Sequence, residues 1–230
     1  MDNFTFYSPT EFIFGRGVQK DTGKALRRYG ASKVMIVYGS ERIRESGLLG
    51  EIENSLAAEG IEYCEFGGIS PNPVASSVYA GIARAVAEGV DFLLAVGGGS
   101  PIDAAKGIAL GAVTTEDFWN FYNGTSVPSA ALPVGVVLTI PAAGSEGSGN
   151  SVITNEKTHQ KISVRYPFLL RPRFAIMNPE LTFSLPWFQT ACGITDMMAH
   201  IFERYFSNTS GTQLVDSYSE AILRDIMDQA

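Results

Sequence analysis

The sequence has few of the residues that define disulfide-rich, zinc-binding or nucleic-acid-binding proteins. Its two cysteines, Cys64 and Cys192, are far apart and form no CxxC pair, so neither a disulfide framework nor a cysteine zinc site is expected. We expect both thiols to be free and at least half-buried. The 17 Lys and Arg residues are outnumbered by 24 Asp and Glu residues and form no basic stripe. This balance argues against a nucleic-acid partner and favours a small-molecule ligand.

Long hydrophobic runs are also missing. No apolar stretch approaches the roughly 18 residues that a membrane span needs. The first six residues have neither the basic start nor the apolar run of a signal peptide. We therefore expect a cytoplasmic protein with no membrane partner. With 45% hydrophobic residues among 230, the chain can bury a sizeable core.

The most informative stretch of the sequence is residues 91–106. A predicted buried strand leads directly into Gly97, Gly98 and Gly99 and then into a helix, which Ser100 as the cap and Pro101 at the first position would begin. Glycines let the backbone approach an anion closely, and a helix N-terminus offers free N–H groups to phosphates. The pattern is not GxGxxG, so the alternative is a plain strand-to-helix connector.

Apolar runs alternate with amphipathic stretches along residues 1–178, which is typical of a parallel sheet flanked by helices. After a short N-terminal strand and a turn at 15–17, strands are predicted at 33–38, 62–66, 92–96 and 134–140. Helical spacing of apolar residues predicts helices around 48–57 and 78–87. The sequence therefore predicts an α/β fold with a Rossmann-like parallel sheet.

Helical signals replace strand signals from Asn178 onward. We place a boundary there, between a domain at 1–178 and the beginning of an all-α domain at 179–230. A helix carrying residues 193–206 is predicted, then a break at 207–211 and a last helix from about Thr212. Two amphipathic helices alone cannot enclose a core, and no cap precedes Ala230, so we expect this second domain to be cut short.

Two further places could carry chemistry. The loop at 139–150 is rich in small and hydroxyl residues and follows a predicted parallel strand, where ligands bind in open α/β sheets; a flexible connector is the alternative. Asp196 and His200 lie four residues apart, on one face of a predicted helix, and could reach one divalent metal. The alternative there is a local Asp–His pair. His159 is expected to be a solvated loop residue.

Four motifs, in this order, resemble the iron-containing (group III) alcohol dehydrogenases, and in particular their butanol dehydrogenase and aldehyde reductase branch. They are GGGSPIDAAK at 97–106, matching the family's GGGSxxDxAK, GSE at 144–146, NP at 178–179 and GITDMMAH at 193–200. The resemblance implies that an N-terminal dinucleotide-binding domain faces an all-helical domain for metal and substrate across a cleft.

The resemblance also implies which residues bind the cofactor and the metal. Asp196 and His200 match the first two ligands of Fe²⁺ or Zn²⁺, and two further histidines would come from beyond residue 230. The motif 140–143 (IPAA) replaces Thr-Ala-Gly-Thr and removes two hydroxyls from the nicotinamide contact. The implied cofactor residues are Gly98, Gly99 and Ser100 at the pyrophosphate, Asn72 and Thr139 at the nucleotide, Ser145 and Lys161 on the ribose side, and Asp103 of the glycine motif.

Cofactor choice is predicted from the turn after the strand at 33–38. NAD enzymes place a carboxylate at the ribose 2′-hydroxyl, where a 2′-phosphate would be repelled. In this family's NAD-preferring members the turn carries Asp, whereas Gly39 and Ser40 stand here and resemble the NADP-preferring members. Arg42 is a candidate partner of the phosphate, and Glu41 opposes it. We expect NADP, with NAD as the alternative.

The implied activity is metal-assisted hydride transfer between the nicotinamide and a short-chain primary alcohol or aldehyde. No catalytic side chain is assigned besides the metal and cofactor residues. One alternative is a relative such as a glycerol or glycerol-phosphate dehydrogenase or a dehydroquinate synthase. Another is a non-catalytic nucleotide-binding fragment. The family also suggests a homodimer formed partly through N-terminal strands.

Overall fold

The structure is a computed structural model that describes residues 3–230. Its contacts divide the chain into a unit that ends at Thr182 and a unit from Phe183 to Ala230, each described by itself. Among residues 3–230, no helix combines the length and the apolar character that a membrane crossing requires. The elements of the first unit are β1 (Glu11–Phe14), a 3-10 helix (Val18–Asp21), α1 (Thr22–Arg28), β2 (Lys33–Tyr38), α2 (Arg42–Glu45), α3 (Leu48–Ala58), β3 (Glu62–Phe66), α4 (Ala75–Glu88), β4 (Phe92–Gly97), α5 (Gly99–Gly111), α6 (Trp119–Tyr122), β5 (Val134–Leu138), a 3-10 helix (Ser145–Gly147), β6 (Asn150–Asn155), β7 (Gln160–Arg165), α7 (Pro167–Leu170), β8 (Phe174–Met177) and a 3-10 helix (Pro179–Thr182).

Six strands form one parallel sheet in the order β1-β8-β5-β4-β2-β3. The predicted α/β fold with a Rossmann-like parallel sheet is therefore confirmed. β2 and β3 have the predicted bounds, whereas β5 ends at Leu138, two residues before the predicted end. The reason is that Ile140 crosses the glycine segment, where a Cβ added to Gly98 would lie 2.3 Å from Ile140 Cγ2.

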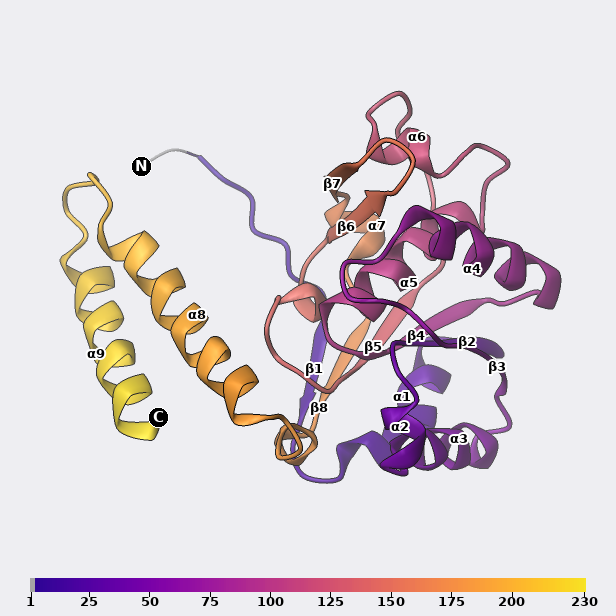
Figure 1. Ribbon diagram of the computed structural model, residues 1–230, viewed down its shortest axis with the longest axis horizontal. Helices are drawn as coiled ribbons and strands as arrows, with labels where there is room; N and C mark the ends of the chain where they lie inside the picture. Colours follow the sequence, from indigo (N-terminus) through magenta and orange to yellow (C-terminus); the bar gives the residue numbers. More distant parts are fainter. Residues whose placement is uncertain (1–2) are drawn as a thin grey trace. The chain divides into compact units, whose positions relative to one another are not determined.

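Helices cover both faces of this sheet (Figure 1). Because side chains alternate along a strand, Met35 and Val37 of β2 pack on the face covered by α4 and α5. Val34 and Ile36 of the same strand pack on the opposite face with α1 and α3. The two apolar layers explain why the central strands β4 and β5 are apolar throughout, since both sides of a parallel sheet are buried.

The order of the strands locates the ligand edge of the sheet. β2 is followed by β3 on one side and β4 is followed by β5 on the other, so the direction in which successive strands are added to the sheet reverses between the neighbouring parallel strands β2 and β4. In open α/β sheets, ligands bind at the carboxyl ends of strands beside such a switch point. The turns that begin at Gly39 and at Gly98 are the two that flank it.

A β-hairpin that the sequence analysis did not predict lies outside the main sheet. β6 and β7 pair in antiparallel register, with Thr154 opposite Lys161. The hairpin contributes Ile153 and Val164 to the core on the α4 and α5 face. The sequence did not indicate this hairpin because residues 150–165 are mostly polar. Only packing against α5 determines which of their side chains are buried. β8 was missed as well, because four residues carry too short a pattern.

The second unit consists of α8 (Trp187–Tyr205) and α9 (Gln213–Gln229), which pack on each other. The Tyr205 hydroxyl donates to Glu220 Oε1 at 3.0 Å and links the two helices. α8 begins directly after Pro186, and the break at 206–212 separates the helices as the sequence predicts.

The close packing of α1 on α3 can be tested by replacing glycines with alanine. A Cβ added to Gly23 of α1 would lie 2.1 Å from the Ser55 carbonyl oxygen of α3, whereas one added to Gly50 of α3 would meet nothing within 4 Å. We expect Gly23→Ala to lower the free energy of unfolding by about 3 kcal/mol, because backbone must move. Gly50→Ala should leave it unchanged or raise it by up to about 1 kcal/mol. Urea unfolding of both variants checks this, and equal effects would contradict the packing.

Candidate functional site

Helix α5 begins two residues earlier than the sequence predicts. Its first residue is Gly99 and its cap is Gly98, which makes no side-chain capping bond, so the prediction of Ser100 as the cap and Pro101 at the first position is wrong. The physical reason is space: Ile140 leaves no room for a Cβ on Gly98, and Ala143 would lie 2.9 Å from a Cβ on Gly99. Only glycines let the backbone turn this close to the loop after β5.

The N–H groups at this turn are available to a ligand. The first N–H groups of a helix have no partner within it. Within residues 3–230, no protein acceptor takes those of Gly98, Gly99 and Ser100, and all three residues are partly exposed. The positive end of the α5 dipole points the same way, so the turn is suited to an anion such as a diphosphate.

The turn after β2 lies beside this helix start. The Gly39 carbonyl accepts the Gly68 N–H at 2.9 Å, and a Cβ on Gly39 would lie 3.2 Å from the Ile69 carbonyl oxygen and 3.8 Å from Pro101. Ser40, which follows, is exposed. The structure therefore brings Gly39 and Ser40 to the same edge of the sheet as the glycine turn.

Asn72 contacts two other predicted cofactor residues, Ser100 and Lys161. Its backbone is in the left-handed region, with φ 55°. Its N–H donates to Ser100 Oγ at 3.3 Å, and its Oδ1 accepts a bond from Lys161 Nζ at 2.6 Å. Residues from the loop before α4, from α5 and from β7 thus meet at one place. Thr139 lies nearby in the fold, because its N–H donates to the Gly97 carbonyl at 3.1 Å.

Asp103 of α5 and Ser145 of the loop at 139–150 contact each other on the inner side of that loop. Ser145 Oγ donates to Asp103 Oδ1 at 2.6 Å, and the Val152 N–H donates to Asp103 Oδ2 at 3.1 Å. Burial raises the pKa of Asp103, although the bond from Ser145 and the charge of Lys106 oppose the shift. Ser145 is itself buried. Both side chains make their hydrogen bonds within the protein, so they stabilise the loop at 139–150 from its inner side.

Lys106, which the sequence analysis quoted in the glycine motif without a role, is the centre of this arrangement. Its side chain is fully buried, and its three N–H donors are shared by four oxygens within hydrogen-bond distance of Nζ. These are the Ser145 carbonyl at 2.6 Å, Ser145 Oγ at 2.8 Å, the Ser148 carbonyl at 2.9 Å and the Asn150 carbonyl at 2.8 Å. Burial lowers the pKa of Lys106 to about 8, while Asp103 and Glu146 oppose the shift. The oxygen acceptors that surround Nζ favour the charged ammonium form.

One sequence signal could have revealed this role. Between Pro101 and Gly111, Asp103 and Lys106 are the only charged residues of a helix that is otherwise apolar on all sides. They stand three residues apart and so share a face. Charged groups in a helix buried all round must be paired or bonded inside the protein.

Asp196 and His200 lie on α8 in the second unit. His200 Nε2 is 3.6 Å from Asp196 Oδ2, and the two side chains are 64% and 57% exposed. Within residues 3–230, no cluster of three potential metal ligands occurs. Catalytic metal centres take three protein ligands, so these two residues alone do not form a complete one.

The remaining polar predictions have mixed outcomes. His159 is exposed in the turn between β6 and β7, as predicted. Both thiols are free, but Cys192 is exposed, so the prediction that it is buried or half-buried is wrong; Cys64 is buried. Cys192 lies on α8 of the second unit, and no residue of this helix is buried.

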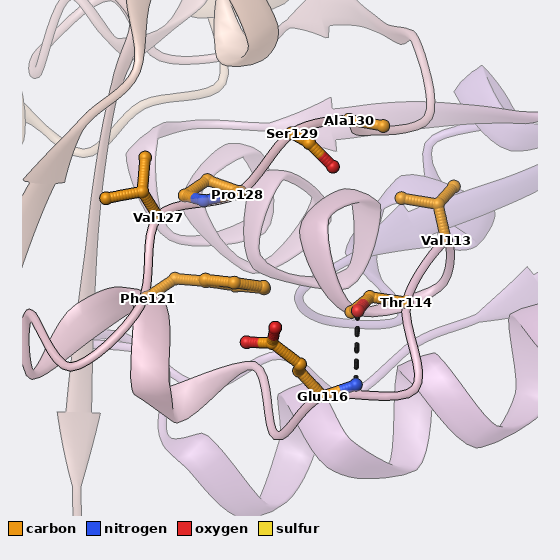
Figure 2. A pocket seen from close by; sticks show the side chains of 8 residues that line it. All are labelled: Val113, Thr114, Glu116, Phe121, Val127, Pro128, Ser129 and Ala130. Atoms are coloured by element: carbon orange, nitrogen blue, oxygen red, sulfur yellow. Dashed lines mark hydrogen bonds between the residues drawn. The ribbon is translucent and has the colours of Figure 1, made fainter.

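Two cavities help to delimit the site. Figure 2 shows one of about 70 Å³, lined by side chains of the connection between α5 and β5, including Glu116, Phe121 and Pro128. It is too small for a nucleotide. A mainly apolar cavity of about 160 Å³ lies instead where β1, β5 and β8 end, and its lining includes Leu138, Pro141 and Met177. This cavity adjoins the loop at 139–150.

Comparison with known proteins agrees with the motifs. The family described as "Iron-containing alcohol dehydrogenase" matches residues 9–179. The chain is 42% identical over 230 residues to "Probable NADH-dependent butanol dehydrogenase 2" of Bacillus subtilis, covering all of this chain and 58% of that protein. It is 33% identical over 231 residues to "NADPH-dependent aldehyde reductase YqhD" of Escherichia coli, covering 99% of this chain and 58% of that protein.

A solved structure shows the same fold. The NADH-dependent butanol dehydrogenase A from Thermotoga maritima matches with a TM-score of 0.92 and 40% identity, over 99% of this chain and 57% of that one. The chain thus spans less than three fifths of the length of each of these relatives.

The buried ammonium generates a prediction about stability. Lys106→Met removes the donor to four oxygens and leaves the Asp103 carboxylate without its neighbouring positive charge, so we expect the free energy of unfolding to fall by about 3 kcal/mol. Lys157→Met, at an exposed lysine of the β6–β7 turn, is the matched control and should change it by less than about 0.5 kcal/mol. Urea unfolding measures both. A similar small effect for the two variants would refute the role of Lys106.

Proposed function

Because the chain belongs to the iron-containing alcohol dehydrogenase family, we propose that it is the dinucleotide-binding part of an NAD(P)-dependent oxidoreductase that interconverts short-chain primary alcohols and aldehydes. Relatives named butanol dehydrogenase and aldehyde reductase support this choice of substrates. The observation that carries the proposal is the set of available N–H groups at Gly98, Gly99 and Ser100, beside the switch point of a parallel sheet.

In this proposal, each predicted cofactor residue has a physical task. Gly98, Gly99 and Ser100 donate N–H groups to the diphosphate, and Lys161 adds a positive charge beside it. Asn72 holds Lys161 and Ser100 together, as its two hydrogen bonds support. Thr139 contacts the nucleotide at the end of β5. Asp103 and Ser145 act indirectly, by holding the loop at 139–150 in place.

In the same proposal, the two domains have different roles. Residues 1–178 bind and orient the dinucleotide, and residues 179–230 begin the part that holds metal and substrate. Asp196 and His200 supply two ligands, and iron is the metal that the family's description names, whereas zinc has no such support. Residues 3–230 contain no third ligand beside these two, so the task derived for this chain is to position the cofactor. A cytoplasmic location and a homodimer stay predictions.

NADP is the cofactor that we propose. Gly39 and Ser40 provide no carboxylate for a ribose 2′-hydroxyl. Glu41 lies one residue on, but its carboxylate is paired with Arg44 at 3.2 Å, which reduces its repulsion of a phosphate. Arg42 is exposed and could approach the 2′-phosphate. The relatives include NADH-dependent and NADPH-dependent proteins, so the choice needs a direct measurement.

Binding at the glycine turn is tested with a charge placed there. Ser100→Asp puts a carboxylate among the free N–H groups, which suits a helix N-terminus but repels a diphosphate. We expect the Kd for NADPH, measured by nucleotide fluorescence, to rise at least about tenfold with the melting temperature unchanged. Ser100→Asn, which is isosteric with Asp but neutral, should raise the Kd much less. Equal Kd values for the two variants would place the diphosphate elsewhere.

Cofactor choice is tested at Gly39. Its φ is not positive, so Asp can adopt this backbone conformation, and Gly39→Asp would supply the carboxylate that favours a 2′-hydroxyl over a 2′-phosphate. The added Cβ would lie 3.2 Å from the Ile69 carbonyl oxygen, a contact that Gly39→Asn shares. We expect the ratio of the Kd for NADH to the Kd for NADPH to fall by about tenfold, which corresponds to about 1.4 kcal/mol. Gly39→Asn is the uncharged control. If the parent chain prefers NADH, the NADP proposal is wrong whatever the variants do.

A further inference from the structure

The tip of the β6–β7 hairpin is attached to the N-terminus of α4 by one side chain. The cap residue of α4, Val74, makes no side-chain capping bond, so the first N–H groups of this helix need other acceptors. Glu156, 80 positions further along the chain, supplies one: its Oε1 accepts the Ser76 N–H at 3.2 Å. Hydrogen bonds from Ser76 lower the pKa of Glu156, so it is charged near neutral pH.

The geometry of the turn holds Glu156 in this position. Asn155 Oδ1 accepts the N–H groups of Lys157 and Thr158, at 3.0 and 3.3 Å, and so closes the turn on either side of Glu156. The contact is therefore presented by an ordered turn, although Glu156 itself is exposed.

A second attachment lies two residues away and reaches the cofactor residues. The Thr154 N–H donates to the Pro73 carbonyl at 2.9 Å, and Thr154 forms a parallel bridge with Val74. Lys161 is the residue directly opposite Thr154 in the hairpin, and its ammonium group contacts Asn72. The hairpin tip, the start of α4 and the Asn72 loop therefore form one continuous set of contacts that ends at Ser100.

We propose that Glu156 is a positioning residue, which holds the hairpin tip on α4 so that Lys161 and Asn72 stay aligned with the phosphate-binding turn. Glu156 does not touch the dinucleotide in this proposal and acts through Lys161, whose ammonium group in turn holds Asn72. The proposal rests on the proposed function, because it assumes that a dinucleotide diphosphate is the ligand of the turn.

The experiment is a double-mutant cycle on NADPH binding. We expect Glu156→Ala to raise the Kd about fivefold and Lys161→Met to raise it about tenfold. Glu156→Ala should add less than about twofold when Lys161 is already Met, because the residue acts through that lysine. Glu156→Gln, which keeps an oxygen acceptor, should retain most of the affinity. Lys157→Ala, on the next residue of the turn, is the control and should bind like the parent chain.

Independent effects of Glu156→Ala and Lys161→Met, or an unchanged Kd for Glu156→Ala, would overturn the proposal. Amide hydrogen exchange of the ligand-free variants separates it from the proposed function. Glu156→Ala should speed exchange at residues 72, 74–76 and 160–162, whereas Lys157→Ala should not. If the parent chain binds no dinucleotide, the proposed function fails, and faster exchange would still support the positioning role. Unchanged exchange would overturn that role in either case.

Discussion

The edge of the sheet that carries the glycine turn depends on one buried ammonium group. Lys106 has no contact with solvent, and its donors are used by oxygens of Ser145, Ser148 and Asn150. A charge in that position is stable only while the loop surrounds it, because an isolated buried ion would lose far more in hydration than it gains. The loop after β5 is therefore held in one conformation by the helix that it covers.

That conformation explains two of the three glycines, Gly98 and Gly99, by close approach, whereas Gly97 has a positive φ of 150°. The loop held by Lys106 brings Ile140 and Ala143 against Gly98 and Gly99, at distances that leave no space for a Cβ on either glycine. The same close approach leaves the N–H groups at the start of α5 without protein partners. The replacement at 140–143, which removes two hydroxyls relative to the family pattern, thus affects the wall of the glycine turn as well as the nicotinamide contact that the resemblance implies.

The hairpin β6–β7 connects this loop to the rest of the site. Its first residues are bonded to Asp103 and Lys106, and its tip is bonded to α4 by Glu156 and to Pro73 by Thr154. Lys161 lies between these attachments. Exposed lysine side chains are usually flexible, but this position gives Lys161 a defined partner in Asn72. Parts of the chain almost 90 residues apart are thus aligned at one edge of the sheet.

The sequence by itself determined the fold class, the strands β2, β3 and β4, the two C-terminal helices and the glycine turn. These features follow from local patterns: apolar runs, helical spacing and residues with special backbone freedom. Only the tertiary structure decided that Gly98 rather than Ser100 caps α5, that Asp103 and Ser145 face each other below the surface, and that Glu156 reaches α4. It also gave Lys106 its role and β6–β7 their pairing. The reason is that a hydrogen bond or a close contact between distant residues depends on where the whole chain places them, and no pattern within either segment records its partner.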